Sequence, residues 1–293
     1  MYDFSAVYIP ESLEQALRMK HDHPQARILA GGSDILIQVR EGRLAGIEVI
    51  SIQALDELRG VTLEDDGTVL IRPLTSFSHV SSDPVIRRCV PVLGEAVDQV
   101  GGPQIRNIGT IGGNICNGVT SADSAATLKA LDAELEISSV GGTRRLPYAE
   151  FNLGAGKVDL KADEILTGIR IPRDSWENTF GHYIKYSQRR AMDIATLGCS
   201  ANVRLSKNKR KIERFRLAFG VAAPVPIRAF SAEAVANGSL ISSELIENIA
   251  QAALKDVNPR SSWRASKEFR QHLIAELTRR ATRAAIEKAG GTL

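Results

Sequence analysis

Two glycine pairs far apart in the chain constrain its fold more than any other feature. The first lies in Ala30-Gly31-Gly32-Ser33-Asp34 and the second in Thr110-Ile111-Gly112-Gly113-Asn114. Glycine turns the backbone through positive φ and lets it approach a ligand closely. Successive free N–H groups in such a turn form a concave anion site. Because the two loops have similar chemistry, we expect them to bind a single diphosphate from both sides.

The familiar nucleotide-binding motifs are missing around these pairs. No Gly-x-Gly-x-x-Gly follows a predicted strand, which argues against a Rossmann site, and no P-loop sequence occurs. A nucleotide site in this chain must therefore be of another type. In such a site Ser33 and Asn114 could donate to phosphate or ring carbonyl oxygens, and Thr110 could bond a phosphate oxygen. Taken alone, either loop is also compatible with an ordinary structural turn.

Residues 1–55 are expected to form a compact α/β unit around the first pair. A helix should begin after Ser12, a favoured N-cap residue. Residues 27–30 and 48–52 are short apolar strands, and residues 34–40 a short helix. A strand, a glycine turn and a helix in succession present free N–H groups to a phosphate.

Residues 56–174 are expected to form a second unit around the second pair. Asp65-Asp66-Gly67 is a hairpin signal between strands at 59–63 and 68–71. Residues 101–114 are too rich in glycine for a helix and too long for a bare turn, which is typical of a functional segment. The remaining elements of this unit are expected to be two or three short helices between residues 76 and 100 with Pro84 and Pro91 in first turns, a helix at 124–131, and strands at 135–137 and 165–171.

Residues 175–293 are expected to form a third unit of strands followed by helices. That order suggests an α+β layer pair. The strands are predicted at 183–186, 196–205 and 212–219, and the helices at 244–254 and 264–289. The last helix carries one apolar stripe of Phe269, Leu273, Leu277 and Ala281.

Composition excludes several classes of protein. No apolar run is long enough to cross a bilayer, and the N-terminal residues lack the features of a secretion signal. The three cysteines, Cys89, Cys116 and Cys199, are widely spaced, which suits a reducing, cytoplasmic compartment. They are too few for an iron–sulfur cluster, which needs about four thiolates. The five histidines show no metal-ligand spacing, so no metal site is predicted.

Basic residues gather in the last third of the chain, although the net charge is only +3. One set lies around a predicted hairpin and is expected to be solvated: Lys207, Lys209, Arg210, Lys211, Arg214 and Arg216. Arg260, Arg264, Lys267 and Arg270 could instead face a partner subunit. Few aromatic residues lie among these basic residues, so no nucleic-acid partner is expected.

Asp123 and Lys185 each allow two interpretations. Asp123 lies where a helix should begin, so its carboxylate could cap that helix or contact a ligand. Lys185 lies on a predicted strand, where its ammonium could be solvated or could stabilise negative charge on a bound cofactor.

The two loops and the stretch Thr120-Ser121-Ala122-Asp123 resemble the FAD-binding subunits of the molybdenum hydroxylases. That family includes xanthine dehydrogenases and the flavoprotein of aerobic carbon monoxide dehydrogenase. The resemblance covers essentially the whole chain and continues, in the same order, through Asp163-Glu164-Ile165-Leu166, Lys185, Met192-Asp193-Ile194-Ala195 and Ser262-Trp263-Arg264-Ala265-Ser266. The stretches most similar to bacterial xanthine dehydrogenase flavin subunits are Gly102-Pro103-Gln104-Ile105-Arg106-Asn107, Cys116-Asn117-Gly118 and Ser261-Ser262-Trp263.

The resemblance implies a fold and a set of cofactor contacts. The implied fold is α+β, with a two-part FAD-binding domain of the vanillyl-alcohol-oxidase type and a C-terminal three-stranded sheet with helices, as in carbon monoxide dehydrogenase flavoproteins. For Asp123 the resemblance favours a ligand contact over a helix cap, although one residue can do both. The implied FAD-binding residues are Arg27, Ile28, Leu29, Ala30, Gly31, Gly32, Ser33, Asp34, Thr110, Ile111, Gly112, Gly113, Asn114, Asp123, Ile165, Leu166 and Lys185.

The resemblance also implies a function. The chain would be the FAD-binding electron-transfer subunit of a molybdenum-dependent xanthine dehydrogenase, which takes electrons from 2Fe–2S clusters on a small subunit and reduces NAD+. The molybdenum cofactor would lie on a large subunit. Because the flavin carries the chemistry, no catalytic acid or base is assigned in this chain. The alternatives are a carbon monoxide, aldehyde or N-heterocycle hydroxylase subunit, which could be quinone-linked, and a non-redox assembly or binding protein with the same fold.

Overall fold

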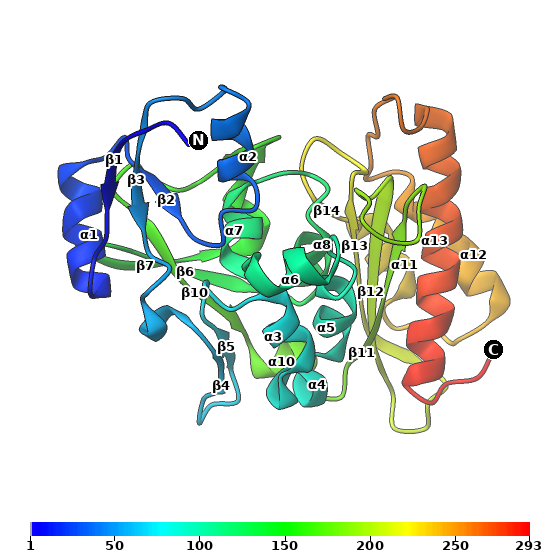
Figure 1. The fold of residues 1–293 in the computed structure, drawn as a ribbon. Helices are drawn as coiled ribbons and strands as arrows, with labels where there is room; N and C mark the ends of the chain where they lie inside the picture. Colours follow the sequence, from blue (N-terminus) through cyan, green and yellow to red (C-terminus); the bar gives the residue numbers. More distant parts are fainter. Residues whose placement is uncertain (1) are drawn as a thin grey trace.

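A computed structural model describes residues 2–293 and shows an α+β protein with three main sheets side by side (Figure 1). The first sheet is parallel, and its strand order is β1 (Phe4–Tyr8), β3 (Ile47–Ser51), β2 (Arg27–Leu29). The helix α1 (Leu13–Asp22) packs against β3 and is capped by Ser12, as predicted. From β2 the chain runs through the first glycine pair into α2 (Ile35–Arg40), which confirms the predicted strand, turn and helix.

The second sheet is antiparallel and forms the middle of the molecule. Its strand order is β4 (Val61–Leu63), β5 (Val69–Ile71), β10 (Ile165–Ile171), β6 (Glu134–Ser139), β7 (Gly142–Pro147). Every residue of β10 is buried, as a central strand with both faces covered should be. The other elements of this part are η1 (Asp56–Leu58), α3 (Phe77–Ser82), α4 (Pro84–Cys89), α5 (Pro91–Val97), α6 (Pro103–Ile108), α7 (Ile111–Cys116), α8 (Asp123–Ala130), α9 (Tyr148–Phe151), the paired strands β8 (Asn152–Gly154) and β9 (Lys157–Val158), and α10 (Arg173–Trp176).

The third sheet belongs to the C-terminal part and has one strand more than predicted. Its strand order is β11 (Phe180–Tyr186), β12 (Leu197–Leu205), β13 (Ile212–Gly220), β14 (Ile227–Arg228). The three long strands match the predicted ones. The two-residue strand β14 was missed because its only ladder is a short pairing with β13.

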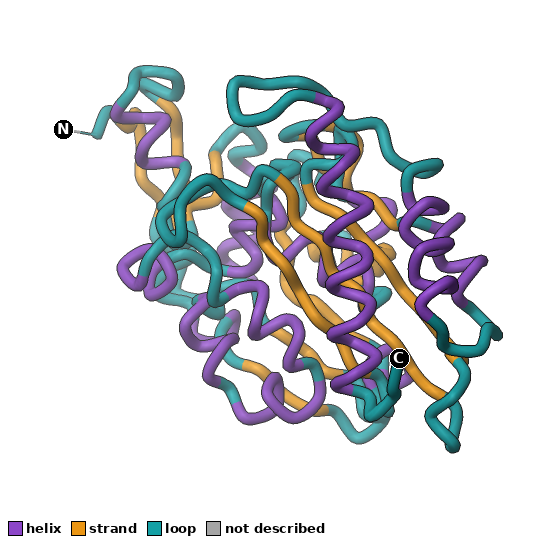
Figure 2. The backbone as a smooth tube through the Cα atoms, turned by 90° about the vertical axis from the view of Figure 1, so that its right-hand side faces the viewer, coloured by secondary structure: helices purple, strands orange, loops and turns teal. Residues whose placement is uncertain are grey.

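Helices cover both faces of this C-terminal sheet. Figure 2 shows α13 (Lys267–Lys288) lying over one face, beside α11 (Phe230–Ala236) and α12 (Ser243–Ala253). The helices α5 and α8 pack on the other face and so join the sheet to the middle of the molecule. Three residues of the predicted stripe on α13, Leu273, Leu277 and Ala281, are buried, but Phe269 is 41% exposed and packs on Tyr186 instead.

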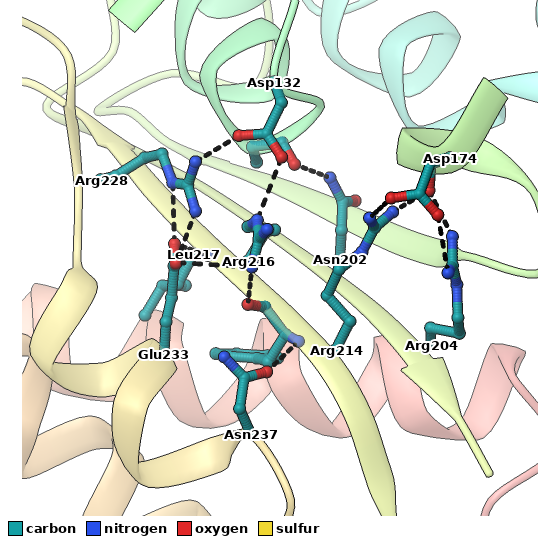
Figure 3. Close-up of polar contacts among 12 residues, drawn as sticks. Asp132, Asp174, Asn202, Arg204, Arg214, Arg216, Leu217, Arg228, Glu233 and Asn237 are labelled. Atoms are coloured by element: carbon teal, nitrogen blue, oxygen red, sulfur yellow. Dashed lines mark hydrogen bonds and ion pairs between the residues drawn. The ribbon is translucent and has the colours of Figure 1, made fainter. Parts of the chain in front are cut away.

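Arginines on the C-terminal sheet bind carboxylates of the middle part (Figure 3). Arg216 Nε lies 3.1 Å from Asp132, and Arg228 pairs with the same carboxylate. Arg204 lies 2.9 Å from Asp174, which Arg214 also binds. The prediction that Arg214 and Arg216 are solvated is therefore wrong. They point inward on β13, where the next layer supplies acidic partners.

Some features had no strong local signal. The strands β1 and β7 and the helix α11 were not predicted, because the apolar pattern of each element is short or is interrupted by polar residues. Among the described residues, no helix combines the length and the apolar character required to cross a bilayer.

Candidate functional site

The first glycine loop presents a row of free backbone amides. Gly32 has a φ of +75°, which the loop needs in order to turn from β2 into α2. Within residues 2–293, the amides at positions 31–34 donate no hydrogen bond. The loop is partly exposed, so a ligand can reach it from solvent. A row of unpaired amides in a glycine turn is the feature expected of an anion site.

The second glycine pair lies inside a helix, so the prediction that residues 101–114 are not helical is wrong. The segment contains α6 and α7. Pro103 begins α6, and Thr110 caps α7 by accepting a hydrogen bond from the Gly113 amide at 3.1 Å. A Cβ at Gly112 would lie 2.4 Å from Pro73 Cβ. The glycine is therefore required by close packing, and a capped first turn offsets its poor helix propensity.

The amides of the second loop are already paired. The Ile111 amide donates to Thr75 O at 3.0 Å, and the Gly112 amide donates to Pro73 O at 2.9 Å. With Gly113 bound to the capping hydroxyl, this turn offers no free N–H group of its own at these positions. What it offers is an open surface at Gly113, which is exposed, and the side chain of Asn114.

The two loops meet in space although they are far apart in the sequence. A Cβ at Gly31 would stand 1.9 Å from the carbonyl oxygen of Ile108 and 3.2 Å from Gly109 Cα. The backbone of the first loop therefore lies directly on the residues that precede the second. Asn114 Oδ1 accepts a hydrogen bond from Ser124 Oγ at 2.7 Å, so its amide nitrogen is the group left to donate to a ligand. One ligand could thus contact both loops.

Asp123 and Lys185 form a buried ion pair between the middle part and the C-terminal sheet. Asp123 is the first residue of α8, and Ala122 occupies the N-cap position, so the carboxylate does not cap the helix. Lys185 Nζ, on β11, lies 2.7 Å from Asp123 Oδ2 and donates to Gln99 O at 2.8 Å. Both side chains are more than nine-tenths buried. Burial raises the pKa of Asp123, and the Lys185 ammonium acts in the opposite direction.

The remaining predicted contacts differ in exposure. Arg27 is exposed on β2, Ile28 is half-buried and Leu29 is buried. Ile165 is 2% exposed and Leu166 is 4% exposed, each within a hydrophobic core. Because both side chains are buried in these cores, a ligand contact at these positions requires their main chain.

Tyr183 was not predicted to be part of the site. Its hydroxyl donates to Asp123 Oδ1 at 2.8 Å, and only 3% of the residue is exposed. The alternation of the strand was a usable signal, because residues 183 and 185 must share a face. The loop after β11 also approaches the site: a Cβ at Gly102 would lie 2.4 Å from Met192 Sδ.

Other reactive groups lie apart from this arrangement. Among residues 2–293, no cluster of His, Cys, Asp and Glu could hold a metal ion. Burial raises the pKa of Cys116 to about 12, which makes its thiol a poor nucleophile. A cavity of about 380 Å³ is lined by Glu95, Asp98 and neighbouring residues of α3 to α5 and shares no residue with the glycine loops.

Comparison with known proteins gives matches along the whole chain. Residues 2–174 match the FAD binding domain in molybdopterin dehydrogenase, and residues 182–285 match the CO dehydrogenase flavoprotein C-terminal domain. The chain is 44% identical to the xanthine dehydrogenase FAD-binding subunit of Escherichia coli O157:H7, with 100% of both chains covered. It is 30% identical to the glyceraldehyde dehydrogenase medium chain of Sulfolobus acidocaldarius, covering 92% of this chain and 94% of the relative. A structure of carbon monoxide dehydrogenase from Hydrogenophaga pseudoflava matches with a TM-score of 0.92 at 28% identity, covering 98% of this chain and 99% of that one.

Proposed function

This chain belongs to the family of FAD-binding subunits of the molybdopterin dehydrogenases, and from that premise we propose that it carries electrons from 2Fe–2S clusters on a partner subunit to NAD+. Family membership makes it an oxidoreductase subunit of a molybdenum hydroxylase complex of the xanthine dehydrogenase type. Xanthine as the oxidised substrate is proposed from the name of the Escherichia coli relative.

The row of free amides at positions 31–34 is the observation that carries the FAD site. These donors suit a diphosphate, and the first loop packs on Ile108 and Gly109, which immediately precede the loop that carries Gly113 and Asn114. Asp123 and Lys185 would line the far end of the site, next to the flavin ring. The proposed site thus draws on all three proposed units, residues 1–55, 56–174 and 175–293, with residues 27–34, 110–114, 123, 165–166 and 185 as its lining.

The bound cofactor and the protein would each supply a different part of the chemistry. Bound FAD supplies hydride transfer, and the protein supplies position and electrostatics. Lys185 Nζ has bonds to Asp123 and to Gln99 O, so one of its three N–H donors stays free for a ligand. With three cysteines, the chain is short of the roughly four thiolates that an iron–sulfur cluster needs. The clusters and the molybdenum cofactor are therefore proposed to lie on partner subunits.

A visible absorption spectrum of the purified full chain, repeated after anaerobic addition of NADH, tests this proposal. The expected result is a flavin spectrum that NADH bleaches, since electron transfer between flavin and nicotinamide is reversible. Dithionite serves as the control that any bound flavin can be reduced.

The outcomes separate the parts of the proposal. Flavin that dithionite bleaches and NADH does not would overturn NAD+ as the acceptor and favour a quinone. No flavin, even after reconstitution with FAD, would overturn the site assignment and favour an assembly protein. The substrate is tested separately, by assaying the assembled complex with xanthine and with an aldehyde.

A further inference from the structure

A buried tyrosine joins the two halves of the candidate site. Tyr183 lies on β11, in the C-terminal sheet, and its hydroxyl donates to Asp123 Oδ1 at 2.8 Å. Asp123 lies at the start of α8, in the middle part of the molecule. Since the two residues are 3% and 6% exposed, water cannot replace this hydrogen bond easily. The contact therefore fixes the position of the carboxylate.

The tyrosine and the lysine hold the carboxylate from one strand. Tyr183 and Lys185 are two positions apart on β11, so their side chains leave the same face. Tyr183 binds Oδ1 and Lys185 binds Oδ2 at 2.7 Å. Each carboxylate oxygen thus has its own donor, and rotation of the carboxylate would break both bonds.

The neighbouring strand leaves room for the tyrosine. Gly198 on β12 pairs with Lys185 in the sheet register. A Cβ at Gly198 would lie 2.8 Å from the Tyr183 hydroxyl oxygen. Gly198 has no positive φ, so conformational freedom does not explain its presence. The space that the missing side chain leaves is the space that the hydroxyl occupies.

We propose that Tyr183 is a positioning residue of the flavin site: with Gly198 making room for it, its hydroxyl holds Asp123 in the orientation that keeps Lys185 at the cofactor. This inference rests on the proposed function, in which Asp123 and Lys185 line the FAD site. Tyr183 itself touches neither FAD nor substrate and acts through Asp123.

The hydrogen bond should also control the protonation of Asp123. Burial raises the pKa of this carboxyl, and the Lys185 ammonium and the Tyr183 hydroxyl both act against that rise. These two groups, both on β11, are the charged and titratable groups that act on it, and Cys199 on β12 acts on the tyrosine. Burial raises the pKa of Tyr183 well above its ordinary value, so the hydroxyl stays a donor. Without that donor, the pKa of Asp123 should rise further.

Tyr183→Phe tests the inference because it removes the hydroxyl and keeps the ring. The protonated Asp123 is followed by its infrared carbonyl band as a function of pH in the full chain, and Asp123→Asn identifies that band by removing it. We expect the midpoint to move upward by about one pH unit or more, which is a roughly tenfold or larger gain in proton affinity. In the FAD-loaded chain, the slope of the flavin potential against pH should change over the same range.

Two further variants keep the test decisive. Tyr148→Phe removes another buried tyrosine hydroxyl away from Asp123 and should change neither readout. Gly198→Ala crowds the Tyr183 hydroxyl and should reproduce the upward shift, which provides a second route if Tyr183→Phe does not fold.

An unchanged Asp123 midpoint in a folded Tyr183→Phe or Gly198→Ala variant would overturn the positioning role. The infrared titration needs no flavin. A chain that binds no FAD but shows the shift would therefore refute the proposed function and leave the Tyr183–Asp123 contact intact. A chain that binds FAD but shows no shift would support the proposed function and refute the positioning role of Tyr183.

Discussion

Gly31 allows a residue-scale test of the contact between the two loops. Its φ is not positive, so alanine would be conformationally acceptable there. The added methyl, however, would stand 1.9 Å from Ile108 O, and backbone cannot yield as a flexible side chain can. We expect Gly31→Ala to push the loops apart, to lower flavin content severalfold and to cost about 1–3 kcal/mol of unfolding free energy.

Gly141→Ala is the matched control for that substitution. Gly141 is exposed, and its nearest contact for a new Cβ is Ser139 Oγ at an ordinary 3.6 Å. Flavin content is measured from the ratio of visible to ultraviolet absorbance, and stability by urea unfolding. Normal flavin content in Gly31→Ala would show that the site does not depend on the contact between Gly31 and Ile108.

The sequence located the important glycines but not the reason for each. Gly32 supplies a positive φ, and a glycine in a turn commonly indicates that conformation. Gly31 and Gly112 are instead required by Ile108 and Pro73, which lie 77 and 39 positions away in the sequence. A close approach of that kind depends on tertiary packing. For the same reason, the partner of Tyr183 could not be predicted from its strand alone.

At the scale of elements, one carboxylate just after α8 binds arginines of both β13 and β14. Asp132, just after α8, binds both Arg216 and Arg228 (Figure 3). Its φ of +48° lies in the left-handed region, which asparagine tolerates better than alanine. Asp132→Asn therefore removes the charge without straining the backbone. We expect it to lower the free energy of unfolding by about 1–2 kcal/mol, because two poorly exposed guanidinium groups lose a partner.

Asp174→Asn serves as the control for this prediction. Asp174 also binds two arginines, but 75% of its side chain is exposed. Solvent screens such pairs, so the loss should be about 1 kcal/mol or less. Urea unfolding of both variants provides the comparison. Equal losses would mean that the lower exposure of the pairing at Asp132 adds nothing to the stability of the junction.

A second contact between elements should depend on pH. Glu95 on α5 binds His182 on β11 at 3.1 Å and Lys288 at the end of α13. Burial raises the pKa of Glu95, but the hydrogen bonds from His182 and Lys288 outweigh that effect and leave it below the ordinary value. A depressed carboxyl pKa stabilises the fold above the unfolded-state pKa, and this contribution is lost as the pH falls through the folded-state pKa.

Glu95→Gln should therefore cost about 1 kcal/mol or less at neutral pH and progressively less in acid. The measurement is urea unfolding of both proteins across the acidic range. A difference between wild type and variant that stays constant with pH would exclude a charge interaction at this site.

Local sequence signals predicted most elements because the signals and the structure agree there. Pro84 and Pro91 start α4 and α5, and Ser12 caps α1. The failure at residues 101–114 arose because glycine content was given more weight than two start signals, Pro103 and Thr110. Arg270, which from its sequence context could face a partner subunit, is 2% exposed and donates to Ser262 Oγ at 2.8 Å. Nothing in its local sequence distinguishes it from the exposed Lys267.

For the whole molecule, the proposed cofactor would contact three regions of the fold. The first sheet with α1, the second sheet with its helices, and the C-terminal sheet with α11 to α13 each have a hydrophobic core. The proposed diphosphate donors come from the first region, and the Asp123–Lys185 pair joins the second to the third. A ligand that contacts all three should stabilise their arrangement as well as its own site.

Hydrogen exchange with FAD and with ADP tests this arrangement in the full chain. Any ligand specific for the folded state stabilises it, by about 2.7 kcal/mol when its concentration is about 100 times Kd. FAD and ADP can therefore be matched in overall stabilisation. ADP has the diphosphate but no flavin, so beyond the shared overall stabilisation its added protection should be confined to the two glycine loops, residues 31–34 and 110–114. FAD should also protect β11, because its ring would lie against Lys185. Equal protection of β11 by both ligands would place the flavin away from the Asp123–Lys185 pair.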